Sequence, residues 1–573
     1  MSKVVKKSIP WFLIISLIFT TVLTFNFMSS KVEADSADTS VTVGNTVPVF
    51  DGGFEPYEDA ASATSTPTNV GNDVTFKATA TDDNGDDWKL LICSSDSVSG
   101  LSCVADTFCT SDFASSTVQA TCSYTALVGD TETEDWYGFA CDATGCSAED
   151  HKTDADIGPP FHVNHSPAFT VFADDGPKDP NTTITWSTTA SDPDSGGSDT
   201  VSLYVCKTAS FTGSACGDET WCSDTAKASN PTCGVTTPRP DGVYEAYGYV
   251  VDNHSFVSVD SAQGDDSSPE VNNSSPSITN SSINLLDTDS SGNLTLTGEE
   301  TETTGFIVTF IVNDENSCMT TSSADEITSA FINVRMSEKA TGACDITGEY
   351  NPNDCYPDDY ASWNPVCAAS STVDACNDNT DTSVGWACTF PLQYHADPTI
   401  DGTPKALNNW LAAAQAEDDD AANSGLIDGT GTNEMDTFMG YNLTTTAIAY
   451  GTVAPDANSL EQTTIIEATG NVGLDETLFG TKLCDDHPTC AGDDDIAIAE
   501  QVYNLSQGLG WGSGTALVAD PGIEVEMDCI KTTDTVSPAS ASTYWYLHVP
   551  LGQAVDSYTG SNTIVGQVDD ENY

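Results

Sequence analysis

The sequence predicts an all-β protein made of tandem β-sandwich domains with disulfides, preceded by a cleaved signal peptide. Three observations support this fold class: an opening phrase recurs along the chain, an alternating strand follows each copy, and cysteines recur at matched spacings. A recurring pattern marks where each folding unit starts and which positions it uses alike. Hydrophobic residues make up 38% of the chain, so these units can bury cores despite a formal net charge of −71.

The first residues have the features of a secretory signal. Lysines precede an apolar run from Ile9 to Phe27, and Val32-Glu33-Ala34 then places small residues where signal peptidase cleaves. We therefore predict a signal peptide over residues 1–34, a mature N-terminus near Asp35 and no membrane span after cleavage. The alternative is an uncleaved anchor, because the run is nearly long enough to span a bilayer.

The opening phrase appears three times, as Val43–Phe50, Val163–Phe169 and Val271–Ile278, each with a proline before the last residues. We interpret each copy as a linker followed by a first strand. An alternating strand comes next, with every second residue apolar, as expected for a strand with one face on a core and one face in water. Its inward positions are Val74, Phe76, Ala78 and Ala80, then Ile184, Trp186, Thr188 and Ala190, then Phe306, Val308, Phe310 and Val312.

An acidic turn follows each alternating strand, at Asp82–Asp87, Asp192–Asp199 and Asn313–Asn316. Gly, Asn and Asp suit such turns because they tolerate positive φ or bond their own backbone. Carboxylates that meet between loops could also chelate calcium, and a solvated turn is the alternative. The candidate ligands in these turns are Asp82, Asp83, Asp86, Asp192, Asp194 and Asp199.

A separate loop is a local candidate for calcium. It supplies side-chain oxygens at loop positions 1, 3 and 5 and a glycine at position 6, as a calcium loop needs, although its acidic residue comes one place after position 12. An Asp/Ser-rich turn without a metal is the alternative. The candidate ligands are Asp287, Asp289, Ser291, Asn293 and Glu299.

All 19 cysteines follow the signal segment, so we expect an oxidising compartment and a disulfide framework, with one thiol left over. The first two repeats carry matched sets of four, and each set allows three connectivities, which stay open. These sets are Cys93, Cys103, Cys109 and Cys122, and Cys206, Cys216, Cys222 and Cys233.

Two further disulfides are predicted. Cys141 and Cys146 have no counterpart in the second repeat and are lost together, so we expect them to bond each other. Cys484 and Cys490 flank a histidine, but their spacing does not suit a zinc finger and the compartment favours a disulfide. Cys529 is then the candidate for the odd thiol and for an intermolecular bond.

The strand and turn Ala78–Asp86 resemble bacterial Ig-like, cadherin-like repeats, which stack on large exported surface proteins. The resemblance covers about residues 47–425 and implies immunoglobulin-like sandwiches. We predict domains over residues 35–162, 163–270 and 271–428, the third with a cysteine-rich insertion and a final strand at Trp410–Ala416. Val384–Phe390 in this third domain matches Val118–Tyr124 in the first.

Residues 429–573 lack the repeat phrase but are predicted to form a further β-sandwich. Expected strands lie at Ala447–Tyr450, Thr463–Ala468, Ile496–Tyr503, Gly522–Met527 and Tyr544–Val549. The runs Tyr450–Pro455 and Asn471–Gly473 are similar to domains at the ends of archaeal and bacterial surface-layer-like envelope proteins.

The strongly acidic balance, with 87 Asp and Glu against 16 Lys and Arg, repels nucleic acid and anionic membranes. It also favours cations that relieve self-repulsion, so calcium is the candidate cofactor. Signatures such as HExxH, GxSxG or a phosphate-binding glycine loop are absent from the sequence, and we predict that the protein is not an enzyme.

The sequence therefore predicts a secreted structural protein of the cell surface, a subunit of a surface layer or an extracellular filament. Its expected partners are other copies of itself or other envelope proteins. The first alternative is an adhesin or glycan-binding protein, and the second is a secreted hydrolase with an unrecognised site.

Overall fold

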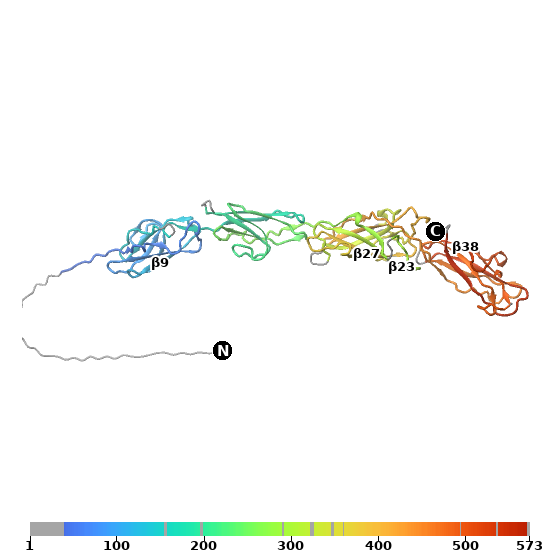
Figure 1. Cartoon of the computed structure of the whole chain (residues 1–573). Helices are drawn as coiled ribbons and strands as arrows, with labels where there is room; N and C mark the ends of the chain where they lie inside the picture. The colour runs from blue at the N-terminus through green and yellow to red at the C-terminus, as the bar shows by residue number, and fades with distance from the viewer. Residues whose placement is uncertain are drawn as a thin grey trace, which may run out of the picture. The chain divides into compact units, whose positions relative to one another are not determined.

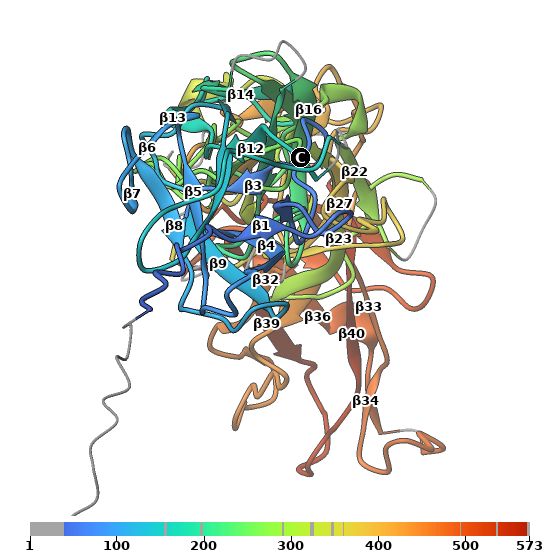
Figure 2. The ribbon, with the colours of Figure 1, turned by 90° about the vertical axis from the view of Figure 1, so that its left-hand side faces the viewer.

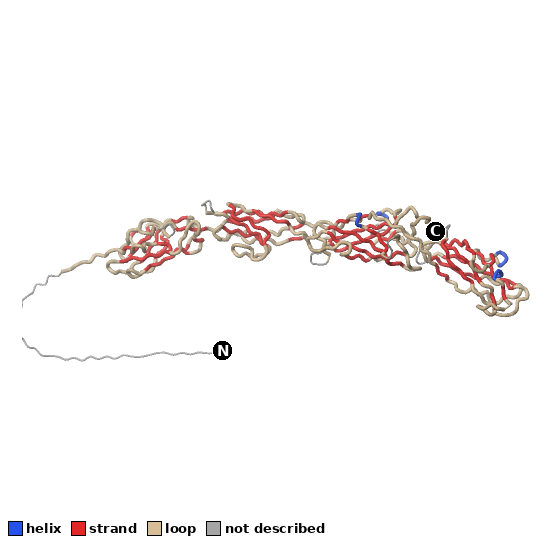
Figure 3. The backbone as a smooth tube through the Cα atoms, viewed as in Figure 1, coloured by secondary structure: helices blue, strands red, loops and turns tan. Residues whose placement is uncertain are grey.

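The computed structural model describes residues 39–153, 157–194, 199–288, 292–320, 326–344, 349–358, 360–361, 363–492, 494–533 and 537–569. Strands dominate these residues, and the helices among them are short 3₁₀ turns (Figure 3). No helix in the described part of the chain is long and apolar enough to cross a membrane. The predicted signal peptide at residues 1–34 lies outside the described residues.

Two compact units make up the chain, coloured from blue to red in Figure 1. Among the described residues, the first contains those up to Ala61 with Val74–Tyr124 and Asp135–Pro160, and the second contains Ser62–Asp73, Thr125–Glu134 and those from Phe161 onward. The domain limits expected from the repeats stay predictions.

The first unit holds a sandwich of two sheets. One sheet contains β1 (Val49–Phe50), β2 (Tyr57–Glu58), β4 (Asp73–Thr81) and β9 (Gln119–Thr125), and the other has the order β11 (Tyr137–Cys141), β5 (Lys89–Cys93), β8 (Thr107–Thr110). Side chains at alternate positions of β4 are buried, as the alternation predicted. Among them, the ring of Phe76 lies edge-on to Trp136 with centroids 4.9 Å apart, so aromatic contacts fill this core.

The second unit begins with a sandwich of the same plan. Its sheets have the orders β13 (Ala168–Asp174), β14 (Thr183–Ser191), β17 (Thr232–Thr236) and β16 (Thr220–Lys227), β15 (Val201–Cys206), β19 (Tyr247–Asp252). Trp186 on β14 is fully buried between these sheets, which confirms the inward face expected for this strand. A small sheet of β10 (Thr133–Glu134), β12 (Phe161–Asn164) and β3 (Thr68–Asn69) also belongs to this unit.

The next sandwich is larger. One sheet contains β21 (Ser277–Ile278), β22 (Asn284–Asp287), β23 (Glu302–Asn313), β27 (Ser383–Gln393) and β26 (Val366–Ala369); the other has the order β25 (Cys355–Tyr356), β24 (Ile327–Met336), β28 (Trp410–Asp418), β29 (Ile427–Asp428). Strand β28 confirms the strand expected at Trp410–Ala416, and β27 contains the run Val384–Phe390 that matches the first repeat.

The last sandwich also has two sheets. One contains β30 (Tyr441–Leu443), β31 (Ala457–Asn458), β32 (Gln462–Ala468), β36 (Gln501–Asn504), β37 (Thr515–Ala516) and β39 (Ser540–Val549). The other has the order β38 (Ile523–Cys529), β33 (Leu474–Gly480), β40 (Asn562–Val568), and Figure 2 shows β33 beside β40. The all-β sandwich fold is thus confirmed along the chain.

Two strand predictions fail in this last sandwich. The expected strand at Ala447–Tyr450 belongs to no sheet, and the one at Ile496–Tyr503 is divided by the 3₁₀ turn Ile498–Glu500. Strands β33 and β40 were not expected. Their sequences contain buried acidic residues or a glycine at inward positions, so their alternation is weak.

The disulfides lie within the expected sandwiches. The two matched sets share one connectivity, first to second and third to fourth, and the predicted bonds Cys141–Cys146 and Cys484–Cys490 are both present. The remaining bonds lie in the third sandwich. The complete set is Cys93–Cys103, Cys109–Cys122, Cys141–Cys146, Cys206–Cys216, Cys222–Cys233, Cys318–Cys376, Cys344–Cys355, Cys367–Cys388 and Cys484–Cys490.

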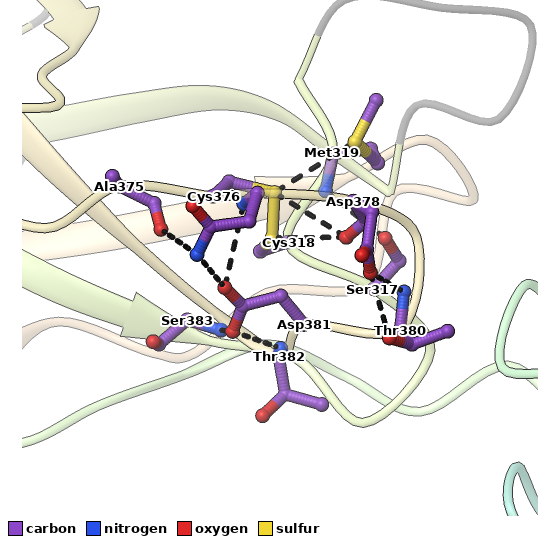
Figure 4. The surroundings of a disulfide bond; sticks show 11 residues. Ser317, Cys318, Met319, Ala375, Cys376, Asp378, Thr380, Asp381, Thr382 and Ser383 are labelled. Atoms are coloured by element: carbon purple, nitrogen blue, oxygen red, sulfur yellow. Dashed lines mark hydrogen bonds between the residues drawn. A yellow bond between two sulfur atoms is a disulfide. The ribbon is translucent and has the colours of Figure 1, made fainter.

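Figure 4 shows how Cys318–Cys376 holds the cysteine-rich insertion of the third sandwich. Asp378 follows Cys376, and its Oδ1 accepts the backbone N–H of Thr380 at 2.8 Å, which closes the turn that leads into β27. The disulfide therefore fixes the inserted loop to the chain that leaves β23.

Cys529 is the free cysteine, as expected, but it is only 2% exposed and packs in the core of the last sandwich. Burial raises the pKa of its thiol to about 11. The expectation that Cys529 forms an intermolecular bond is wrong for this fold, because the sulfur does not reach the surface.

Candidate cation sites at the linker ends of the sandwiches

In the first sandwich, two strand ends bring carboxylates together. Strand β4 leads through the acidic turn into β5, and β11 runs antiparallel to β5, so β4 and β11 end at the same pole. Asp82 follows β4, Asp142 follows β11, and their ligand oxygens lie within 4.8 Å of one another and of Asp86. Asp83, also predicted as a ligand, is exposed and lies outside this group.

Asp82 is only 4% exposed. Its Oδ1 accepts the backbone N–H groups of Asn84 at 2.8 Å and Asp86 at 3.3 Å. Its Oδ2 is buried and has no hydrogen-bond partner among the described residues. A buried carboxylate oxygen without a donor is costly unless a proton or a cation neutralises it.

Asp142 connects this group to the linker. Its Oδ2 accepts the Asn45 side-chain amide at 2.6 Å, and its Oδ1 accepts the backbone N–H groups of Thr144 at 2.6 Å and Gly145 at 2.7 Å. Burial opposes ionisation of Asp142, but these donors outweigh it and lower the pKa of the carboxyl. Asp142 is therefore an ionised ligand candidate, which sequence reasoning missed.

The second sandwich repeats this plan. The side-chain amide of Asn164, from the matching linker phrase, donates to Asp252 Oδ2 at 2.8 Å; Asp252 is the last residue of β19, whereas Asp142 directly follows β11. Asp192 Oδ1 accepts the backbone N–H of Asp194 at 3.0 Å, and its Oδ2 is buried without a partner among the described residues. Burial, assisted by the charges of Asp194, Asp252 and Asp199, raises the pKa of Asp192 to about 6.

Histidines distinguish this second pole from the first. His165 Nδ1 lies 2.7 Å from Asp194 Oδ1, and His254 Nε2 lies 3.0 Å from Asp199 Oδ1. The structure therefore brings Asp194 and Asp199 to histidines rather than into one ligand group with Asp192. Asp194 and Asp199 thus have imidazole partners, and the cation site expected from these three aspartates stays a prediction.

The third sandwich has the same linker contact. The side-chain amide of Asn273 donates to Asp418 Oδ2 at 3.1 Å. Asp314, only 2% exposed, accepts the backbone N–H of Asn316 through Oδ1 at 2.8 Å, and its Oδ2 has no partner among the described residues. All three repeats thus share one arrangement. A linker amide bonds an aspartate at a strand end, and a nearby turn aspartate has one carboxylate oxygen without a partner among the described residues.

A second acidic group lies beside this third contact. Oxygens of Asp241, Glu326 and Asp419 lie within 4.8 Å of one another. Glu326 is 2% exposed, and its Oε2 has no hydrogen-bond partner among the described residues. Sequence reasoning missed this group, because its members come from three separate loops.

Two members of this acidic group, and Asp314 beside it, have raised pKa values. Burial, with the charges of Asp241, Asp419 and Asp314, raises the pKa of Glu326 to about 8. Burial and neighbouring aspartates likewise raise the pKa of Asp314 to about 7 and that of Asp241 to about 6. At neutral pH such a group must hold protons or a cation, and oxygen ligands of this kind suit calcium.

In the described part of the loop predicted from Asp287, one candidate ligand bonds the loop's own backbone and another bonds a side chain outside the loop. Asp287 Oδ2 accepts the Thr295 N–H at 2.9 Å, the Asn293 side-chain amide donates to Asp436 at 2.7 Å, and Glu299 is exposed. Asp289 and Ser291, the other predicted ligands, lie outside the described residues. The calcium site expected at this loop stays a prediction.

Cys484, His487 and Cys490 also lie close enough to hold a metal. The two sulfurs are bonded to each other, however, and a disulfide offers no thiolate ligand. Cys484 and Cys490 therefore form a structural disulfide, as their spacing predicted.

No protein-family model matches the chain, and no curated protein sequence matches it. Solved structures to which it is similar include an ICAM-5 D1–D4 ectodomain fragment, with 7% identity over 90% of this chain and 99% of that chain and a TM-score of 0.23. The mouse nectin-like molecule 4 ectodomain is 9% identical over 65% of this chain and 96% of that chain, with a TM-score of 0.27. Fibronectin(III)-like modules of Clostridium thermocellum CbhA are 17% identical over 38% of this chain and 92% of that chain, with a TM-score of 0.18. These values carry no argument about function, and the fold assignment rests on the sheets described above.

Proposed function

We propose that this chain is a secreted structural protein of the cell surface, a subunit of a surface layer or extracellular filament, whose successive domains are joined at calcium sites. The observation that carries this proposal is the repeated linker contact. Asn45, Asn164 and Asn273 each donate a hydrogen bond to an aspartate at a strand end. Beside each contact lies a turn aspartate with one buried carboxylate oxygen that has no hydrogen-bond partner among the described residues. A device repeated at consecutive linkers serves the connection between domains. The sequence resemblance to exported Ig-like repeats supports a surface location.

Calcium is the favoured cation for chemical reasons. The candidate ligands at the first and third poles are oxygens, which calcium accepts in flexible numbers, whereas magnesium demands near-octahedral geometry and keeps its water. A net charge of −71 adds a general attraction for cations. A bound cation would also hold the linker, because Asn45 already binds Asp142.

The calcium proposal is tested by melting the mature protein with chelator, calcium, magnesium or matched sodium chloride. A site that forms only in the folded chain adds about 2.7 kcal/mol at about a hundred times its dissociation constant. We expect D82N to reduce the calcium response, and D83N to leave it unchanged, because Asp83 is exposed in the same turn outside the ligand group. Equal effects of calcium and sodium chloride would mean that the response is charge screening and not binding at a site.

The surface role is tested in the cells that make the protein. We expect it to be a dominant component of an envelope preparation, and antibody labelling to decorate a regular layer or filaments outside the cell. A scarce protein that binds a glycan or a host surface would instead favour the adhesin alternative.

A further inference from the structure

An unpaired segment lies on the last sandwich. Residues 445–453, which contain the strand expected at Ala447–Tyr450, make no backbone–backbone hydrogen bond within the described part of the chain. Only the flanks are fixed, because the Thr444 N–H donates to Ile465 O at 3.0 Å and the Asp456 N–H donates to Val549 O at 2.7 Å. This segment has the sequence of a strand but lacks a partner that would complete it.

A groove of about 880 Å³ opens beside this segment. Ile448, Tyr450 and Val453 line it from the segment, and Ile564 lines it from β40. Strand β40 pairs with β33 along one edge, and no strand in the described part of the chain pairs with its other edge. An open strand edge next to a groove that is partly lined by apolar side chains is an arrangement that can accept an added β-strand.

The other end of the chain offers a suitable strand. Residues 39–44 read Thr-Ser-Val-Thr-Val-Gly, and Val41 and Val43 are 87% and 81% exposed. These valines share one face of an extended segment, because they are two residues apart. β-Branched residues dominate the segment, which favours pairing in a sheet. Within the described part of the chain, hydrogen bonds to its own sandwich begin at Asn45.

Charge indicates that these two surfaces suit each other. Copies of a chain with a net charge of −71 repel one another, so a contact between copies needs surfaces with little charge. Residues 39–50 contain no charged residue, and Asp556 is the one charged residue in the groove lining. Both surfaces therefore lack the repulsion that the rest of the chain carries.

We propose that the N-terminal segment Thr39–Gly44 of a second copy inserts into this groove and pairs with the open edge of β40, placing Val41 and Val43 inside. The inference rests on the proposed function, since it names the contact by which a filament subunit would assemble. Donor and acceptor are different surfaces of one chain, so each bound copy presents a further free donor or acceptor and the contact propagates.

The first experiment compares mature full-length proteins by light scattering over a range of concentrations. We expect the wild type to grow in mass and V41D/V43D to stay monomeric with an unchanged melting temperature, because both valines are exposed in the single copy. V128D/V259D is the matched control, since Val128 and Val259 are also highly exposed valines. A wild type that stays monomeric, or a V41D/V43D protein that grows like the control, would overturn the proposal.

A peptide with the sequence of residues 39–50 provides a direct probe of the groove. It should bind the full-length V41D/V43D protein and block assembly of the wild type, while the peptide with both aspartates should bind at least about a hundredfold more weakly, since two valines lose their burial. Equal binding of the two peptides would contradict insertion of the valine face.

Cross-linking locates the contact. Mixing V43C chains with I564C chains under mild oxidation should give a covalent heterodimer. If the wild type assembles but this heterodimer does not form, assembly uses another surface and the strand insertion is wrong. The calcium-dependent melting of the same proteins is independent of this contact, so its persistence would leave the proposed calcium joints standing.

Discussion

Replacing Glu326 with glutamine should change how stability depends on pH. In the folded protein the pKa of Glu326 is raised from 4.5 to about 8 by burial and by the charges of Asp241, Asp419 and Asp314. Between these values the folded state holds a proton that the unfolded state releases. Without a cation, stability is therefore full below about pH 4.5 and is lost as the pH rises toward 8.

The size of this effect follows from the pKa change. At about 1.4 kcal/mol per pKa unit, the rise at Glu326 alone corresponds to at most about 5 kcal/mol. Asp241 and Asp314 titrate together with Glu326, so their contributions do not add, and we expect roughly 3 kcal/mol for the whole group. Glutamine carries no charge at any pH and should remove most of this loss. Calcium should do the same in the wild type, because it replaces the protons.

The assay is calorimetric melting of the mature chain in chelator and in excess calcium between about pH 5 and pH 8. In chelator, the wild type should lose stability over this range, E326Q should lose much less, and E349Q should behave as the wild type, because Glu349 is an exposed glutamate of the same sandwich. If E326Q keeps the full wild-type slope, or the wild type shows no slope in chelator, the reasoning about this acidic group is refuted.

Three further predictions concern the cysteines. Replacing Cys109 and Cys122 with serine should lower the free energy of unfolding of the first sandwich by about 2 to 4 kcal/mol, because their bond restricts the unfolded chain, and denaturant melting measures it. Non-reducing peptide maps should also give Cys141–Cys146 as a separate pair. Cys529 should not react with a thiol reagent in the native protein, since its thiol is buried and has a raised pKa. After unfolding without reductant, the reagent should label one thiol per chain. Rapid labelling of the native chain would contradict the burial of Cys529.

The alternating strands show what local pattern can predict. The inward faces of β4, β14 and β23 were expected from residues two apart, and Phe76, Trp186 and Phe310 are all fully buried. The pattern failed at β33, where Asp475 and Glu476 are buried within the strand. Burial raises the pKa of Glu476 to about 7, and Thr543 on β39 donates to its Oε2 at 2.8 Å. A polar partner on another strand decides such positions, and the local sequence does not contain it.

The sequence by itself determined the all-β class, the repeated strands and the pairs Cys141–Cys146 and Cys484–Cys490, because alternation and close spacing act over a few residues. Only the tertiary structure decided which carboxylates meet. Asp142 joins Asp82 and Asp86 because antiparallel pairing brings two strand ends to one pole, and Glu326 meets Asp241 because separate loops converge. The tertiary structure also decided that the segment beside β40 has no strand partner within the described part of the chain. Strand propensity is a local property of the sequence, but the strand that would satisfy the segment's backbone hydrogen bonds must come from elsewhere in space.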